Sequence, residues 1–280
     1  MQSEERLKVL ARIADLEKQG LWDKDVEDDP ETIILRPNKV DYLGKKLSSK
    51  FKTWLANRAA VKYYEGEIDN GYFVIKDVVG IENFRAVKGG AFLTCNHFNI
   101  YDNYAVYRPI RKDVKKGRLY RIIREGNYTN FSGLYGFLFK NCNTLPLSSD
   151  HHTMQKLYSA ITTLLERGEK ILIYPEQGMW WNYRKPRPMK SGAFRFAVKN
   201  KVPVIPAFIT MEDTDKLDRD GFPVQAYTIH YLPAIYPKEE YTDKQNIEYM
   251  RDTNYAVWKE LYEKVYGEKL AYATESGDKN

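Results

Sequence analysis

The segment Asn96-His97-Phe98-Asn99-Ile100-Tyr101-Asp102 places a histidine and a carboxylate where they could act together on a hydroxyl group. It follows the apolar run 91–95, which predicts a buried strand. On a continuous helix a five-residue step turns by about 140°, so His97 and Asp102 would point apart. They can meet only in a turn or at a helix entrance, and α/β proteins place their chemistry in the turns that follow strands. With Asp102 on one imidazole nitrogen, the other nitrogen is free to accept a proton.

Three later segments carry residues suited to bind a substrate beside this pair. Tyr174-Pro175-Glu176-Gln177-Gly178 follows a second apolar run, where proline ends the strand and Gly178 permits a close approach of the backbone. The segment 189–194 opens a helix whose free amides, together with Lys190, suit an anion. The segment Val202-Pro203-Val204-Ile205-Pro206 is a short strand bracketed by prolines.

In this order and spacing, the four segments resemble the glycerolipid acyltransferases, the family that includes 1-acylglycerol-3-phosphate acyltransferases. That family shows N-H-x-x-x-x-D, then F-P-E-G-T-R/S, then a lysine–glycine helix start, then V-P-[IV]-[IV]-P. The resemblance covers roughly residues 85–235, and its matching positions are Asn96, His97, Asp102, Tyr174, Pro175, Glu176, Lys190, Gly192 and 202–206. A histidine taken alone is more often structural, whereas the four segments together favour catalysis.

The resemblance implies transfer of a fatty acyl group from an acyl thioester to the hydroxyl of a lysophospholipid such as 1-acylglycerol 3-phosphate, a step of phospholipid biosynthesis. The donor is acyl-CoA or acyl-carrier protein, a co-substrate, and neither a metal nor a bound cofactor is expected. His97 would be the general base and Asp102 would orient its ring, without an enzyme nucleophile. The residues expected to bind substrate are Asn96, Glu176, Gly178, Arg184, Arg187 and Lys190.

Two departures from the family pattern lie on the acceptor side of the reaction. Gln177 follows Glu176 where the family has glycine, and the arginine of a further family element has no clear counterpart in 143–148. An acyltransferase for another hydroxyl acceptor, a glycolipid or a polar metabolite, is therefore the alternative. A non-catalytic module that binds anionic lipid is a weaker one, because anion binding needs no general base. For the same reason we expect no nucleic-acid partner.

The charges are segregated along the chain, although the net charge is only +6. Residues 1–31 carry ten acids against five bases, whereas 36–62 carry eight bases and Asp41 as the one acid. Residues 184–201 carry seven bases and no acid. Such segregation predicts an anionic partner. A predicted helix over 41–65, with lysines opposite an apolar face, suits an anionic membrane surface or, equally, its own domain.

The 280-residue composition predicts a protein of ordinary hydrophobicity, with 43% hydrophobic residues and a mean hydropathy of −0.60. No run approaches the ~18 apolar residues that span a bilayer. Cys95 and Cys142 form no disulfide or metal pattern, which indicates a reducing compartment. We expect a cytoplasmic protein, peripheral on the inner face of the cell membrane.

Short apolar runs alternate with helical periodicity from residue 72 onward. Strands are predicted at 72–75, 91–95, 119–123, 144–147, 171–174, 204–210 and 227–232. Helices are predicted at 3–19, 41–65, 102–110, 133–140, 151–166, 191–200 and 246–266. This alternation predicts an α/β fold, a single mixed and largely parallel sheet flanked by helices. With an N-terminal helical pair, it corresponds to the glycerol-phosphate acyltransferase-like fold that the resemblance implies.

The expected organisation has three parts. Residues 1–66 form an N-terminal helical region with possible membrane-surface contact, 67–270 an α/β acyltransferase domain, and 271–280 a polar tail.

Overall fold

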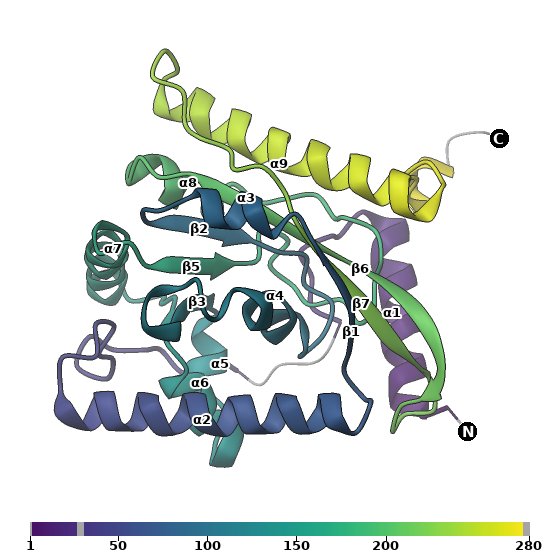
Figure 1. Ribbon diagram of the computed structural model, residues 1–280, viewed down its shortest axis with the longest axis horizontal. Coiled ribbons are helices and arrows are strands. Elements are labelled where there is room, and N and C mark those ends of the chain that lie inside the picture. The colour runs from purple at the N-terminus through teal and green to yellow at the C-terminus, as the bar shows by residue number, and fades with distance from the viewer. Residues whose placement is uncertain (1, 27–30, 277–280) are drawn as a thin grey trace.

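A single seven-stranded sheet forms the centre of the computed structural model, which describes residues 2–26 and 31–276 (Figure 1). Its strands are β1 (Val74–Val79), β2 (Ala91–Thr94), β3 (Leu119–Ile123), β4 (Thr144–Pro146), β5 (Lys170–Ile173), β6 (Val204–Leu217) and β7 (Pro223–Tyr231). Their spatial order is β1-β7-β6-β2-β5-β3-β4. Neighbours run parallel except β6 and β7, which are antiparallel. The predicted mixed, largely parallel sheet is confirmed.

The antiparallel pair is a long hairpin. Its turn is closed by Asp218, whose Oδ1 accepts the backbone N–H groups of Asp220 and Phe222, both at 2.9 Å. Gly221 supplies the positive φ of 78° that this turn needs. β6 continues past its predicted end at residue 210, and β7 begins before its predicted start at residue 227. β6 is buried only as far as Met211, and its last six residues are mostly exposed. The exposed part lacks the apolar pattern on which the strand prediction rested.

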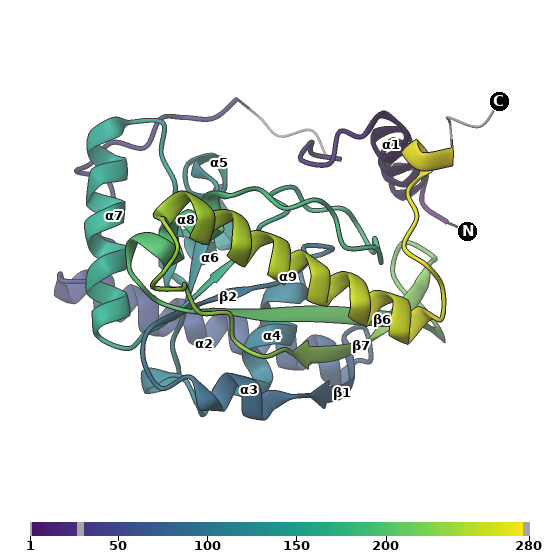
Figure 2. The same cartoon turned by 90° about the horizontal axis from the view of Figure 1, so that it is seen from above.

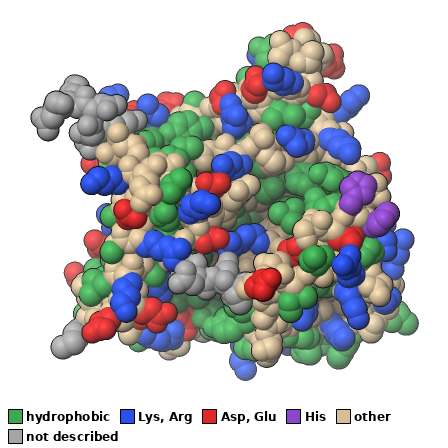
Figure 3. All heavy atoms as spheres, turned by 180° about the vertical axis from the view of Figure 1, so that it is seen from behind, with side chains coloured by type: hydrophobic (Ala, Val, Ile, Leu, Met, Phe, Trp, Pro, Cys, Tyr) green, Lys and Arg blue, Asp and Glu red, His purple; other side chains and the backbone are tan. Residues whose placement is uncertain are grey.

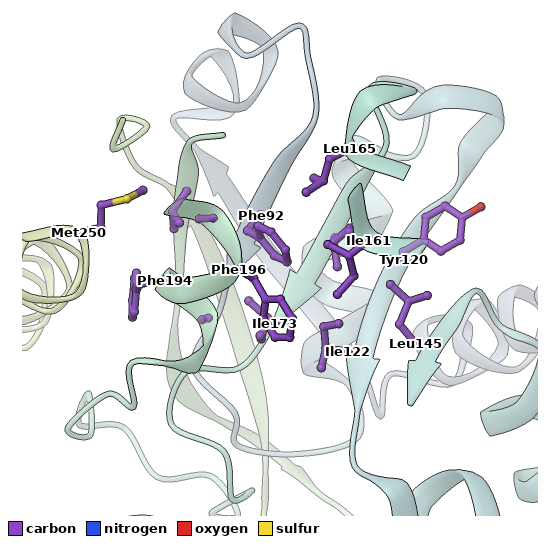
Figure 4. Close-up of a cluster of buried hydrophobic side chains, with 14 of the residues drawn as sticks. Phe92, Tyr120, Ile122, Leu145, Ile161, Leu165, Ile173, Phe194, Phe196 and Met250 are labelled. Carbon is purple, nitrogen blue, oxygen red and sulfur yellow. The ribbon is translucent and has the colours of Figure 1, made fainter. Parts of the chain in front are cut away.

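Helices cover both faces of the sheet because strand side chains alternate between two hydrophobic clusters. Phe92 and Ile171 join the cluster packed under α7, α8 and α9 (Figure 4), whereas Leu93 and Leu172 join the one packed under α3 and α4. The helices are α1 (Glu4–Gln19), α2 (Leu47–Asp69), α3 (Ile81–Ala86), α4 (Asp102–Ile110), α5 (Glu125–Thr129), α6 (Gly133–Asn141), α7 (His151–Glu166), α8 (Gly192–Lys199) and α9 (Asp243–Tyr266). Sequence periodicity missed α3 and α5, which are shorter than two turns.

The two N-terminal helices lie apart rather than as a packed pair (Figures 1 and 2). α1 lies beside the C-terminal 3₁₀ turn Ala273–Ser276. α2 lies along α6 and reaches α4, where Tyr104 Oη donates to Glu65 at 2.7 Å. The expected boundary after residue 66 falls within the last turn of α2. Within the expected polar tail, the Ala273 N–H donates to Glu17 at 3.2 Å, and residues 277–280 lie outside the described ranges. None of the helices described is both long and apolar enough to cross a membrane.

Candidate active site

The turn after β2 and the turn after β5 meet at one edge of the sheet. β2 and β5 are adjacent and parallel, so the residues that follow them emerge side by side. The backbone connects the two turns directly: Trp180 N–H donates to His97 O at 3.1 Å, and Asn182 N–H donates to Phe98 O at 2.9 Å. The segments 96–102 and 174–190, far apart in sequence, therefore form one site.

His97 and Asp102 are in contact, with 2.7 Å between Nδ1 and Oδ2. The turn wraps around the carboxylate, because the N–H groups of Phe98 and Asn99 donate to the same Oδ2 at 3.1 and 3.3 Å. The Asp102 side chain is 1% exposed and that of His97 is 23% exposed. No group within the described ranges bonds to Nε2 of His97. Nε2 is therefore the nitrogen available to a substrate hydroxyl.

Tyr174 completes the surroundings of this pair, although the sequence motif that contains it predicted no role for its hydroxyl. Its hydroxyl donates to the other carboxylate oxygen, Oδ1 of Asp102, at 2.7 Å. Its ring stacks on the imidazole of His97, with 4.0 Å between ring centroids and 17° between planes. Burial, reinforced by the charge of Asp102, raises the pKa of Tyr174 well above its ordinary value, so the hydroxyl stays protonated.

Glu176 and Arg187 form a buried brace beneath the histidine. Glu176 Oε2 accepts the His97 N–H at 3.1 Å and Arg187 Nη2 at 3.0 Å, while Oε1 accepts the Arg187 N–H at 2.7 Å. The guanidinium also donates to Trp22 O at 3.0 Å and to the carbonyl of Gly178. Both side chains are at most 2% exposed. Arg187 was expected at the substrate; the structure places it instead inside the framework, where its hydrogen bonds go to protein groups.

Asn96 and Gly178 also have structural partners where substrate contacts were expected. The Asn96 side chain is buried and bonds to the backbone of Ile209. Gly178 packs against Lys24, whose carbonyl oxygen would lie 3.0 Å from an added Cβ. Gln177, which stands where the family has glycine, has a positive φ of 69°. The backbone thus adopts a glycine-like conformation there without a glycine.

The cations of the basic stretch 184–201 that were expected to bind substrate phosphate are held by carboxylates in this structure. Arg184 donates to Asp213 at 2.7 Å, at the outer part of β6. Lys190 lies 2.9 Å from Asp23, and its hydrogen bond lowers the pKa of that carboxyl below the ordinary value. Figure 3 shows the molecule from behind, where basic and acidic side chains intermingle beside a hollow lined by hydrophobic side chains.

Residues 22–25, which we call the acidic strap, return from α1 to the site. Besides the Asp23–Lys190 pair, Asp25 binds Arg124, the residue directly after β3. The strap is tied to the loop by Trp180 Nε1, which donates to Lys24 O at 2.9 Å. Sequence reasoning missed Arg124 and the strap, and the one available signal was the excess of acids in residues 1–31. Within the described ranges no three His, Cys, Asp or Glu side chains gather as metal ligands.

Comparison with known families matches residues 76–210 to the family model described as Acyltransferase. Among solved structures, a similar chain is the 1-acyl-sn-glycerophosphate (LPA) acyltransferase PlsC from Thermotoga maritima, with 18% sequence identity and a TM-score of 0.49 over 80% of this chain and 81% of that chain. Comparison with curated proteins found no match. The family match contains the His97–Asp102 pair, the Tyr174–Gly178 turn and the segment 202–206 with Pro203 and Pro206. Residues 76–210 of this chain are thus similar to the acyltransferases that the family model describes.

Proposed function

We propose that this acyltransferase moves a fatty acyl group from an acyl thioester, acyl-CoA or acyl-carrier protein, to the hydroxyl of a lysophospholipid such as 1-acylglycerol 3-phosphate. The observation that carries the proposal is the His97–Asp102 contact of 2.7 Å, with Nε2 left for the substrate. A carboxylate that holds Nδ1–H fixes the tautomer in which Nε2 carries the lone pair. That is the arrangement of a general base.

In the proposed reaction, the acceptor oxygen attacks the thioester carbonyl while His97 Nε2 takes its proton. Asp102 stabilises the imidazolium that forms. The tetrahedral intermediate then collapses, the carbon–sulfur bond breaks, and the leaving thiolate takes the proton back from Nε2. The products are an ester and a free thiol, and no bond to the enzyme is formed. General-base assistance of this kind contributes ~10²–10⁴-fold to the rate.

The cations beside the site support an acceptor that carries phosphate. Lys190 binds Asp23 of the acidic strap, and Arg124 binds Asp25 of the same strap. Carboxylate and phosphate oxygens make the same charge-assisted hydrogen bonds to lysine and arginine. An acceptor phosphate could therefore replace Asp23 as the partner of Lys190, or Asp25 as the partner of Arg124. Arg184 is the further cation that we propose for substrate phosphates.

The exposed face of α2 supports contact with a membrane of anionic lipid. Leu47, Phe51 and Trp54 are 81%, 63% and 55% exposed, although all three are large and apolar. Leu134 and Tyr135 on the adjacent α6 are also exposed. Lysines 50 and 52 stand among these side chains in sequence, and each lysine near an anionic surface contributes ~1 kcal/mol. Such contact would hold the enzyme on the inner face of the cell membrane, within reach of its lipid substrate.

Release of free thiol from acyl-CoA or acyl-carrier protein, with acceptors added one at a time, tests the function. Lysophosphatidic acid is the reference acceptor, and a glycolipid and polar metabolites test the alternative. We expect acceptor-dependent release with lysophosphatidic acid and a ~10²–10⁴-fold loss in His97→Ala. His151→Ala is the matched control, because His151 is exposed at the start of α7. Full activity in His97→Ala would refute the general base, and turnover with the glycolipid alone would refute the phosphate-bearing acceptor.

A further inference from the structure

Tyr174 stands where the family motif F-P-E has phenylalanine, so this chain adds one hydroxyl group to its His–Asp pair. The hydroxyl is not solvated as an ordinary surface tyrosine would be. It donates to Asp102 Oδ1 at 2.7 Å, and that oxygen has no other donor within the described ranges. The substitution of tyrosine for phenylalanine therefore completes the hydrogen bonding of a carboxylate that is 1% exposed.

We propose that Tyr174 is a positioning residue that sets the basicity of the His97–Asp102 pair, an inference that rests on the proposed function. A carboxylate that accepts a strong hydrogen bond at one oxygen has less negative charge at the other. Oδ2 of Asp102 then holds the imidazolium of His97 less strongly. The hydroxyl thereby favours neutral His97, the form that can accept the proton of the acceptor.

The ring of Tyr174 has a separate effect, which a phenylalanine ring would share. It covers one face of the imidazole at 4.0 Å between centroids and so restricts rotation of His97. An aromatic face also attracts a cation, so the ring by itself favours the protonated imidazole. The hydroxyl and the ring therefore act in opposite directions on the charge of His97. Tyr174→Phe removes only the hydroxyl and isolates its contribution.

Neighbouring groups do not add a competing titration to the imidazole. Burial raises the pKa values of Cys95, Tyr227 and Tyr64, so these groups stay neutral between pH 5 and about pH 9. Glu176 pairs with Arg187 and contacts the backbone of His97 rather than its ring. Arg121, the remaining charged group that acts on Tyr174, is a permanent cation.

The test compares the pH profile of kcat/KM for the full chain and for Tyr174→Phe between pH 5 and about pH 9. We expect the acidic limb of the variant's profile to move to higher pH by about one unit. The kcat/KM of the variant would then fall about tenfold at the acidic end of the pH range and change little at the alkaline end. Tyr101→Phe is the matched control: Tyr101 lies in the same turn, but its hydroxyl donates to Glu67 at 2.8 Å. Its acidic limb should stay in place. A profile of Tyr174→Phe that coincides with the wild-type profile, or that falls equally at every pH, would overturn the proposal.

A second measurement separates this proposal from the proposed function. The Nδ1 proton of His97, observed by proton NMR at low temperature, reports the strength of its bond to Asp102 without any turnover. In Tyr174→Phe we expect this resonance to move downfield, because Oδ2 becomes the stronger acceptor. An unchanged resonance would overturn the role of Tyr174, whereas full activity of His97→Ala would overturn the general base and leave the NMR result standing.

Discussion

The side chain of Asn96 pairs with the backbone of Ile209 as a strand residue would: Nδ2 donates to the carbonyl at 3.0 Å and Oδ1 accepts the N–H at 2.9 Å. Backbone pairing between β2 and β6 ends at Thr94 and Pro206. The asparagine side chain thus pairs with β6 two residues beyond the last backbone pair, while the backbone turns away toward His97. Asn96, the residue before His97, therefore fixes the point at which the backbone turns out of the sheet.

Asn96→Ala should therefore both destabilise the protein and reduce its activity. The variant leaves two buried backbone groups of Ile209 without partners, at a cost of about 1–3 kcal/mol in the free energy of unfolding. Urea denaturation and thiol release measure the two effects. Asn141→Ala is the control, because the Asn141 amide donates to Phe137 O within α6 rather than to β6. Wild-type activity in Asn96→Ala would show that the asparagine does not position the histidine.

Arg187 and Arg184 lie three residues apart and should respond differently to the same substitution. Arg187→Met leaves the Glu176 carboxylate buried without its cation, which costs about 3–5 kcal/mol. Arg184→Met removes an exposed ion pair with Asp213, which is worth about 1 kcal/mol or less. Chemical denaturation of both variants gives the comparison. Equal losses of stability would contradict the buried brace.

The Asp23–Lys190 pair predicts that the acidic strap competes with the acceptor. In Asp23→Asn the lysine loses its carboxylate partner, so we expect a severalfold lower KM for lysophosphatidic acid, with little change in the KM of the acyl donor. Asp220→Asn, which removes a similar exposed carboxylate from Arg6 at the β6–β7 turn, is the control. An unchanged KM for lysophosphatidic acid in Asp23→Asn would show that Lys190 does not bind the acceptor.

Glu67 should make the stability of the protein depend on pH. Its hydrogen bond from Arg219, and then that from Tyr101, lower its pKa below the ordinary 4.5. For an acid with a lowered folded pKa, the stabilisation is complete above the unfolded pKa and is lost as the pH falls through the folded pKa. Glu67→Gln should therefore cost most near neutral pH, and its cost should shrink below about pH 4.5. Urea denaturation of both proteins at several pH values measures this, and a difference independent of pH would contradict it.

The exposed aromatic side chains of α2 predict binding to anionic vesicles. Replacing Phe51 and Trp54 together by serine should weaken binding at least tenfold, since burial of each ring in the interface is worth about 1.5–3 kcal/mol. Cosedimentation with vesicles that contain phosphatidic acid measures it. Tyr236→Ser, which removes an exposed aromatic side chain from the segment after β7, should bind as the wild type does. Equal binding by the α2 variant would place the membrane contact elsewhere.

The buried strands and the turns after them were predictable because their signals are local. A short, continuous apolar run such as 91–94 indicates a strand covered on both faces, and the four motifs locate the turns. The partners of polar side chains were not predictable in this way. Asn96 and Arg187 have residue types suited to substrate, yet their partners are Ile209 and Glu176, which only the folded chain brings near. The role of the Tyr174 hydroxyl was not predictable either, because an aromatic residue at the end of an apolar strand usually serves packing.

α1 has partners that lie much later in the chain, and this affects the order of folding during synthesis. The segment it leads into bonds across 156 residues, from Lys24 to Trp180, and Glu17 itself bonds across 256 residues to Ala273. The ribosome produces α1 long before those partners exist, and contacts of such long range form late. The brace at Arg187 includes a bond to Trp22 O, so it too waits for α1 to dock. Until residues 174–187 have been synthesised, His97 therefore lacks the Glu176–Arg187 brace that holds its backbone.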